Sequence, residues 1–319
     1  MSSPVMRAIE VARFGGPEVL TAVEIARPEP ISTEVLVEVH AAGVNPVDYK
    51  TRRGGGVATS VGAPPFIPGW DVAGVVVSTG YGVTRVGPGD RVFGMPRFPR
   101  AGSAYAEYVT APSLQLARIP DRLGFREAAA VPLAALTVWQ ALIDAAGLRA
   151  GQTVLVHGAS GGVGHMAVQL AAAKGASVIA TARQSSHAFV AGLGAHELID
   201  REMVPVGRAG TQVDAVVDLV GGADTAAALK TLRPGGVLLA IADDADEETR
   251  AEADRLRVRV LEPLVEPDGR ALDEIAGLLA GGAIKVVVQD SLPLERAAEA
   301  HRRLEAGGVR GKLVLSVRG

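Results

Sequence analysis

Apolar and polar residues alternate along the first part of the chain. Val35, Val37 and Val39 fall on one face of a predicted strand, while Glu38 and His40 fall on the other. Similar patterns, separated by turns rich in glycine and proline, predict strands at residues 5–11, 19–25, 35–40, 71–78, 91–94 and 105–109. We therefore expect residues 1–125 to form an all-β, barrel-like domain.

The pattern changes near residue 127, where helical and strand periodicities begin to alternate. Helices are predicted over segments such as 165–174 and 225–232, and strands at 153–157, 177–181, 197–199, 215–219, 237–241 and 257–261. Such alternation predicts β-α-β units and a parallel sheet. Residues 126–263 are thus expected to form an α/β domain, a doubly wound Rossmann sheet that binds a dinucleotide.

Residues 264–319 form a tail with mixed patterns. Helices are predicted near 271–280 and at 294–306, and strands at 285–289 and 312–317. The last strand has no β-α-β partner in the tail, so we expect it to return to the first domain.

Composition narrows the classes of function. The chain has 319 residues, of which 48% are hydrophobic, enough for two cores. Its 32 basic and 35 acidic residues give a net charge of −3, which argues against a nucleic-acid partner or an anionic membrane surface. The first residues contain no apolar signal segment, and the apolar run near 128–139 is interrupted by Pro132. We expect a soluble, cytoplasmic protein.

The segment 153–164, Thr-Val-Leu-Val-His-Gly-Ala-Ser-Gly-Gly-Val-Gly, is typical of a strand, a tight turn and the start of a helix. A turn built from small residues lets backbone N–H groups approach a phosphate, and a helix N-terminus adds partial positive charge. The dinucleotide fingerprint is matched except that an alanine replaces the first glycine. The residues expected at the pyrophosphate are Ala159, Ser160, Gly161, Gly162 and Val163.

The same letters also permit a serine hydrolase. Gly158, Ser160 and Gly162 match the G-x-S-x-G motif, and Asp218 and His301 follow in the required order. The glycine-rich turn continues past Ser160, however, and the preceding residues predict no parallel sheet. Dinucleotide binding is therefore favoured, with a turn that only packs helix against strand as the plain structural alternative.

Arg183 indicates which dinucleotide binds. It follows the second predicted parallel strand, where NAD-selective sites place an acidic residue, and no acidic residue occurs nearby. A guanidinium there suits a 2′-phosphate, so we expect NADPH, although an ordinary surface arginine is the alternative. Other expected cofactor contacts lie at or after strand ends: Thr181, Val220, Gly221 and Ile241.

Several spaced motifs together resemble the medium-chain dehydrogenase/reductase superfamily, and within it the zinc-independent quinone oxidoreductase group. These motifs lie at residues 41–50, 68–76, 86–94, 132–139, 153–164, 218–222 and 300–315. The resemblance implies a GroES-like β-barrel domain completed by the tail, a Rossmann domain between, and an active site in the cleft. It also implies that Thr137 reaches the cofactor and that residues 257–261 join two subunits in a homodimer.

The resemblance also bears on metal. Zinc-dependent relatives carry a cysteine at the position of Asn45 and a His-Glu pair at the positions of Trp70 and Asp71. The chain has no cysteine, and its six histidines show no metal-ligand spacing. We therefore expect no metal. Without such a Lewis acid, alcohol oxidation is disfavoured, and an electron-poor acceptor is the expected substrate.

Candidate catalytic residues gather in one motif. Asn45 is expected at the cofactor and as donor to a developing oxyanion, or else in a turn before a proline. Asp48 is expected to cap a short helix or to relay a proton, and Tyr49 to donate a proton or line the pocket. Trp70 is expected to form an apolar wall on which a quinone stacks. Lys312 is expected at an ordinary surface position, or else close to the phosphate or nicotinamide cleft. The segment 301–303 is expected to be a solvated helix face rather than a binding patch.

These observations predict an NADPH-dependent, zinc-independent oxidoreductase. Its small-molecule electron acceptor is expected to be a quinone or an α,β-unsaturated carbonyl compound. The alternatives are an enoyl-thioester reductase, a non-catalytic NADPH-binding protein and, last, the serine hydrolase.

Overall fold

The computed structural model describes residues 4–208 and 212–318. They fold into two units. The first comprises Met1–Leu136, Glu266–Gly282 and Val286–Gly319, and the second Thr137–Val265 and Ala283–Lys285. The first unit thus extends beyond residue 125. No helix within the described ranges is long and apolar enough to cross a membrane.

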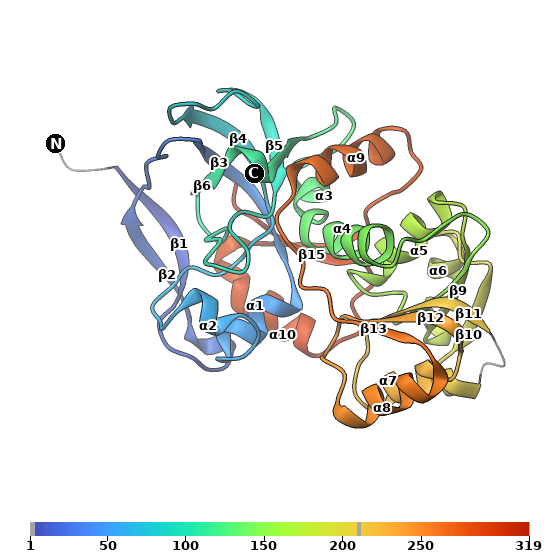
Figure 1. Cartoon of the computed structure of the whole chain (residues 1–319). Helices are drawn as coiled ribbons and strands as arrows, with labels where there is room; N and C mark the ends of the chain where they lie inside the picture. The colour runs from blue at the N-terminus through green and yellow to red at the C-terminus, as the bar shows by residue number, and fades with distance from the viewer. Residues whose placement is uncertain (1–3, 209–211, 319) are drawn as a thin grey trace. The chain divides into compact units, whose positions relative to one another are not determined.

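The first unit is built on a seven-stranded sheet and a two-stranded one (Figure 1). The strand order of the large sheet is β14-β15-β3-β4-β5-β7, with β6 also paired to β3. Its strands are β3 (Glu34–Val44), β4 (Val72–Thr79), β5 (Arg91–Gly94), β6 (Tyr108–Pro112), β7 (Leu116–Arg118), β14 (Val288–Pro293) and β15 (Lys312–Ser316), and the small sheet pairs β1 (Val5–Val11) with β2 (Leu20–Ala26). Leu313 of β15 pairs with Val44 of β3, so the last strand returns to the first domain as predicted.

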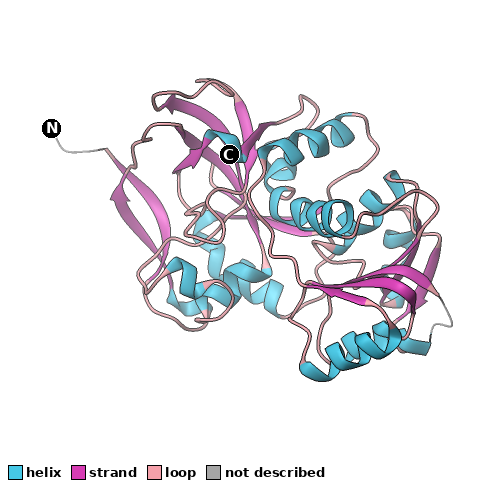
Figure 2. Ribbon diagram, viewed as in Figure 1, coloured by secondary structure: helices cyan, strands magenta, loops and turns pink. Residues whose placement is uncertain are grey.

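Helices interrupt this unit, which is therefore not all-β (Figure 2). They are α1 (Pro46–Arg52), α2 (Ala58–Val61), α3 (Phe125–Ala129), α9 (Gly269–Ala280) and α10 (Ala297–Glu305), while α4 (Pro132–Val138) crosses the boundary between the units. Helix α1 begins after Asn45 because Pro46 presets the first helical turn and Asp48 Oδ2 accepts the Asn45 N–H at 2.7 Å.

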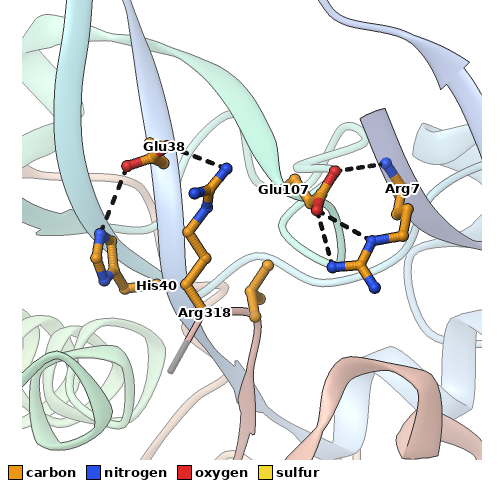
Figure 3. Close-up of a pocket in the computed structure, with 6 residues that line it drawn as sticks. Arg7, Glu38, His40, Glu107 and Arg318 are labelled. Atoms are coloured by element: carbon orange, nitrogen blue, oxygen red, sulfur yellow. Dashed lines mark hydrogen bonds and ion pairs between the residues drawn. The ribbon is translucent and has the colours of Figure 1, made fainter. Parts of the chain in front are cut away.

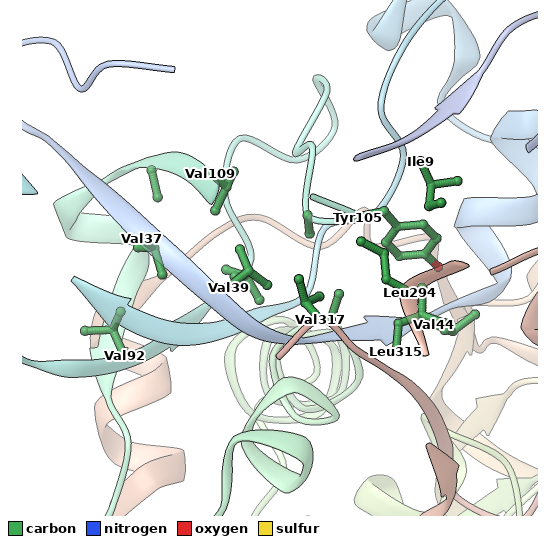
Figure 4. Packing of buried hydrophobic residues seen from close by; sticks show 14 of the residues in the cluster. Ile9, Val37, Val39, Val44, Val92, Tyr105, Val109, Leu294, Leu315 and Val317 are labelled. Carbon is green, nitrogen blue, oxygen red and sulfur yellow. The ribbon is translucent and has the colours of Figure 1, made fainter. Parts of the chain in front are cut away.

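The core of the first unit confirms the valine pattern of β3. Val35, Val37 and Val39 are fully buried members of one apolar cluster. Figure 4 shows Val37 and Val39 in this cluster together with Tyr105 and Leu294. Leu36 on the opposite face of β3 is buried as well. Both faces of this strand are thus covered, whereas an alternating pattern predicts one buried face and one exposed face.

The second unit has the predicted parallel sheet, in the order β10-β9-β8-β11-β12-β13. Its strands are β8 (Thr153–His157), β9 (Ser177–Ala182), β10 (Glu197–Asp200), β11 (Val213–Asp218), β12 (Leu232–Ala240) and β13 (Arg259–Leu261). The intervening helices are α5 (Gly164–Ala173), α6 (His187–Ala191), α7 (Ala223–Leu229) and α8 (Glu247–Leu256), and a π-helical stretch over Trp139–Ala145 follows α4. The order places β13 at one edge, and its pairing is parallel to β12.

Two strands lie further along the chain than predicted. Strand β6 starts at Tyr108 because Ala106 instead bridges to Ala8 of β1. Strand β14 starts at Val288 because Gln169 of α5 binds both the N–H and the carbonyl of Lys285, each at 2.8 Å. That contact assigns residues 283–285 to the second unit.

Candidate functional site

The turn after β8 has the geometry of a phosphate cradle. Gly158 has a φ of +90°, a conformation that favours glycine. A Cβ on Gly164 would lie 2.3 Å from the Gly158 carbonyl oxygen, so α5 starts closer to the turn than any side chain permits. Residues 160–163 are half-buried and precede the N-terminus of α5. The turn therefore fits a pyrophosphate, which backbone amides and the helix dipole would hold.

Two of the predicted cofactor residues, Ala159 and Thr181, are connected to this turn by hydrogen bonds. Ala159 is fully buried, and its N–H donates to the Thr181 carbonyl at 3.0 Å. The Thr181 hydroxyl is also buried: it accepts the Gly158 N–H at 3.2 Å and lies 2.6 Å from His157 Nδ1. These bonds of Thr181 hold the turn in its conformation.

The ends of β11 and β12 lie beside the cradle. A Cβ on Gly158 would approach Val220 Cγ2 to 3.1 Å. The Asp218 carboxylate accepts the N–H groups of Val220 and Gly221 at 3.0 and 3.2 Å, and the Ile241 N–H donates to the Asp218 carbonyl at 3.1 Å. The structure therefore brings Val220, Gly221 and Ile241 to the same carboxyl edge as the turn, where ligands of such sheets bind.

Arg183 follows β9 and is half-exposed. Its Nε lies 3.2 Å from Glu202 Oε1, in a solvent-exposed ion pair that was not predicted. Thr137 also belongs to the second unit, and it is buried in α4 rather than exposed on the helix surface.

The residues that would complete a serine hydrolase have other partners. The Asp218 carboxylate accepts the Thr225 hydroxyl at 2.6 Å, besides two backbone N–H groups. His301 belongs to the first unit, where its two ring nitrogens contact Arg52 and Tyr105. The structure therefore gives no support to a Ser160-Asp218-His301 triad.

In the first unit, Asn45 joins a buried polar cluster with Asp71 and Lys312. Asn45 Nδ2 donates to Asp71 Oδ2 at 2.8 Å, and the Lys312 ammonium donates to Asn45 Oδ1. Lys312 Nζ also lies 3.3 Å from Asp71 Oδ2, with both side chains at most 3% exposed. Asp71 Oδ1 accepts the Leu133 N–H at 2.7 Å. The expected surface position of Lys312 is wrong, because β15 carries it into this cluster.

This donor set does not fit zinc. The cluster offers one carboxylate, whose Oδ2 is bound by an ammonium and an amide, and neither thiolate nor imidazole. In the part of the chain that the structure describes, no three His, Asp or Glu side chains converge as metal ligands. The positive charge beside Asn45 and Asp71 is that of Lys312.

Asp48 lies next to Asn45, three residues later in the chain, and is fully buried. Its Oδ2 accepts the Asn45 N–H at 2.7 Å and the Tyr105 hydroxyl at 2.9 Å, while its Oδ1 is buried without a hydrogen-bond partner among the residues described. Burial raises the pKa of Asp48 to about 7, against the lowering effect of these two hydrogen bonds. Asp48 thus caps α1 and also carries a carboxyl group that titrates near neutrality.

The other two predicted pocket residues, Trp70 and Tyr49, have different surroundings. Trp70 is 1% exposed, its indole N–H donates to the Arg100 carbonyl at 2.6 Å, and Phe98 packs edge-on against its ring. It thus offers no open face for a quinone, and the expected stacking wall is a core residue here. Tyr49 is half-buried, with the Arg53 guanidinium 5.8 Å from its ring centroid.

Three residues around Asp48 were not predicted to lie near it. Tyr105, His301 and Arg52 are all fully buried and connected by hydrogen bonds. The segment 301–303 is a solvated helix face only in part, since His301 points inward while Arg302 is exposed. The available signal was the amphipathic pattern of residues 297–305, which places His301 four residues after the buried Ala297.

A separate hollow of about 530 Å³ lies on the first unit, lined by Arg7, Glu38, His40, Glu107, Val317 and Arg318. Its charges are paired: Arg7 with Glu107 at 2.9 Å, and Arg318 with Glu38 at 3.1 Å (Figure 3). Because none of its lining residues belongs to the Asn45 cluster, we do not assign the chemistry to this hollow.

Comparisons with known proteins agree with the two units. A family model described as "Alcohol dehydrogenase GroES-like domain" matches residues 31–121, and one described as "Zinc-binding dehydrogenase" matches residues 193–315. Quinone oxidoreductases of Mus musculus and Homo sapiens are 35% and 34% identical to this chain, each covering 97% of both chains.

Solved structures give the same result. The quinone oxidoreductase from Coxiella burnetii has a TM-score of 0.93 and 36% identity, over 99% of this chain and 100% of its own. A mycobacterial protein solved in complex with NADPH has a TM-score of 0.85 and 32% identity, over 98% and 100%. The GroES-like unit, the Rossmann unit and these matches together show that the chain is an oxidoreductase of the medium-chain dehydrogenase/reductase superfamily and belongs to its quinone oxidoreductase-like group.

Proposed function

We propose that this protein uses NADPH to reduce quinones or α,β-unsaturated carbonyl compounds without a metal ion. The observation that carries the proposal is Lys312, a buried ammonium group bound to Asn45 and Asp71. The family resemblance implies that zinc-dependent members carry metal ligands at the positions of Asn45 and Asp71. The names of the quinone oxidoreductases to which the chain is similar support the same class of acceptor.

The proposed roles follow from the chemistry of these side chains. The bound nicotinamide supplies hydride, and an acceptor that takes it up develops negative charge on its oxygen. Lys312 Nζ and Asn45 Nδ2 are hydrogen-bond donors suited to that oxygen. Asp71 holds both donors in place, at 3.3 and 2.8 Å. A single ammonium polarises an isolated carbonyl less than zinc does, which favours electron-poor, conjugated acceptors.

NADPH is proposed on three grounds. The turn at residues 158–164 fits a pyrophosphate, and a structural relative was solved with NADPH. Arg183 follows β9, and a guanidinium at this point of such a fold suits a 2′-phosphate. Glu202 pairs with Arg183 at 3.2 Å and would compete with the phosphate for its guanidinium. We expect NADPH binding to displace this exposed pair, because such pairs contribute at most about 1 kcal/mol.

A homodimer remains part of the proposal. Strand β13 (Arg259–Leu261) lies at one edge of the six-stranded sheet, where a second copy can continue the hydrogen-bonding ladder. Sedimentation of the purified protein tests this: a dimer is expected, and a monomer at micromolar concentration would contradict it.

The decisive test of the activity is NADPH oxidation against a panel of quinones, enals, enones and enoyl thioesters. Turnover with quinones or enones supports the proposal. Turnover confined to thioesters would make the protein an enoyl reductase, and tight NADPH binding with no turnover would make it a non-catalytic binding protein. Covalent labelling of Ser160 by a fluorophosphonate would instead support the serine hydrolase alternative.

A further inference from the structure

Four buried side chains near Asn45 are connected by hydrogen bonds in a row: Arg52, His301, Tyr105 and Asp48. Arg52 Nη1 lies 3.1 Å from His301 Nδ1, His301 Nε2 lies 3.2 Å from Tyr105 Oη, and Tyr105 Oη lies 2.9 Å from Asp48 Oδ2. All four residues are fully buried. The chain connects α1, α10 and the loop before β6.

The direction of these bonds follows from the donors available. A guanidinium only donates, so His301 Nδ1 accepts from Arg52. Burial and the positive charge of Arg52 lower the pKa of His301 to about 3, so its ring is neutral and carries its one hydrogen on Nε2. His301 Nε2–H then donates to Tyr105, whose own hydroxyl hydrogen is directed to Asp48 Oδ2.

Arg52 is itself fixed in place. Its Nη2 donates to Glu305 Oε1 at 2.5 Å, and its Nε donates to the Gly15 carbonyl at 3.0 Å. Glu305 is 13% exposed, which places this end of the chain near solvent. Because Arg52 cannot give up a proton, the chain orients hydrogen bonds and does not conduct protons.

The direction of these hydrogen bonds makes the two carboxyl oxygens of Asp48 different. Its Oδ2 accepts two hydrogen bonds, from the Asn45 N–H and from Tyr105, whereas Oδ1 has no partner among the described residues. We propose that Arg52, His301 and Tyr105 are positioning residues, which reserve Asp48 Oδ2 as an acceptor and leave Oδ1 as the atom that takes up and releases a proton. The other charges that act on Asp48 are those of Asp71 and Lys312.

This inference rests on the proposed reduction, which needs such a proton. Hydride brings the acceptor two electrons and one hydrogen, and its oxygen then requires one proton. When Asp48 releases that proton, the Oδ1–H bond breaks and the carboxylate keeps the electron pair. Each cycle therefore consumes one proton from solvent, and the buried Oδ1 must become accessible to solvent between turnovers to regain it.

The test is a titration of the Asp48 carboxyl carbon by NMR in isotope-labelled full-length protein, with Asp48→Asn to assign the signal. Tyr105→Phe removes one donor to Oδ2 and should raise the midpoint by about one pH unit. The matched control is Tyr108→Phe, whose hydroxyl donates to Glu38 instead and which should leave the midpoint unchanged. His301→Leu should act in the same direction as Tyr105→Phe, because it frees the tyrosine hydrogen to turn away.

An unchanged midpoint in Tyr105→Phe would overturn the inference, whatever the activity of the protein. If the wild type turns over quinone, the pH at which kcat is half-maximal should move with the NMR midpoint in Tyr105→Phe. A kcat profile that stays fixed while the midpoint moves would show that Asp48 does not supply the proton. If no acceptor is reduced, the proposed function fails separately.

Discussion

The Lys312 ammonium lies 3.3 Å from Asp71 Oδ2, and both side chains are buried. Lys312→Met should therefore leave an unpaired buried carboxylate and destabilise the protein by about 3–5 kcal/mol. The double variant Asp71→Asn/Lys312→Met removes both charges and should recover much of that loss. Urea unfolding of the two variants and the wild type measures the difference.

The same double variant separates stability from catalysis. It should fold but reduce quinones with a kcat lowered about 10²- to 10³-fold, the usual loss when a donor to a developing oxyanion is removed. Lys230→Met, at an exposed position of the second unit, is the control and should change neither quantity. Near-wild-type kcat in the double variant would show that Lys312 has a structural role alone.

Asp48 and His301 should make opposite contributions to the pH dependence of stability. Asp48 has a raised pKa of about 7, so in the folded state it binds a proton that the unfolded chain releases above about 4. Its contribution to stability is therefore lost as pH rises toward 7. His301 has a pKa lowered to about 3, so its neutral form costs stability below about 6.5 and this cost disappears as pH rises.

In the wild type these two slopes should nearly cancel between about pH 4 and 6.5. Asp48→Asn should unmask His301, so that stability rises with pH by up to about 1.4 kcal/mol per unit. His301→Leu should unmask Asp48 and give the opposite slope. Denaturant midpoints of both variants, measured between about pH 4 and 6.5, test this prediction. A stability that changes with pH in the same direction in both variants would contradict the opposite contributions of Asp48 and His301.

Arg183 should govern the choice between NADPH and NADH. Arg183→Ala should raise the KM for NADPH about tenfold, the loss of one charge-assisted hydrogen bond, and leave that for NADH nearly unchanged. Glu202→Gln removes the competing partner and should lower the KM for NADPH. Arg201→Ala, at the exposed neighbour of Glu202, is the control. Equal effects of Arg183→Ala on both cofactors would reject the assignment.

Trp70 should matter for folding more than for substrate choice. Trp70→Phe keeps much of the packing against Phe98 but leaves the Arg100 carbonyl without its donor. A destabilisation of about 1–3 kcal/mol is expected from the unsatisfied group and the lost volume. KM values for aromatic and small acceptors should change in parallel; a selective rise for aromatic quinones would restore the stacking role.

Local patterns in the sequence predicted much of the fold. Strands such as Val5–Val11 and Thr153–His157 have the predicted bounds, because most of their apolar residues are buried. Periodicity did not predict the N-terminal helices, although the short helix expected at Asp48 is present as α1, where Asp48 accepts the Asn45 N–H. The start of β14 depends on Gln169, a residue 116 positions away, which no local pattern reveals.

In the candidate site, too, some residues belong to local motifs and others are brought in by tertiary contacts. Asn45, Asp48 and Asp71 belong to motifs that the sequence displays, and Asn45 does contact the other two. Lys312 and His301 are distant in sequence and resemble surface residues there. They enter the site because β15 pairs with β3 and because α10 packs against α1. Tertiary pairing, not composition, determined which polar residues became buried partners.

In the proposed reduction a lysine, not a metal, supplies the positive charge. The most direct test of this role is quinone-dependent oxidation of NADPH by chelator-treated, metal-free protein, followed by nicotinamide absorbance. Full turnover without metal, lost about 10²-fold or more in Asp71→Asn/Lys312→Met, is the predicted result. Turnover that vanishes on chelation and returns with stoichiometric zinc would contradict the account.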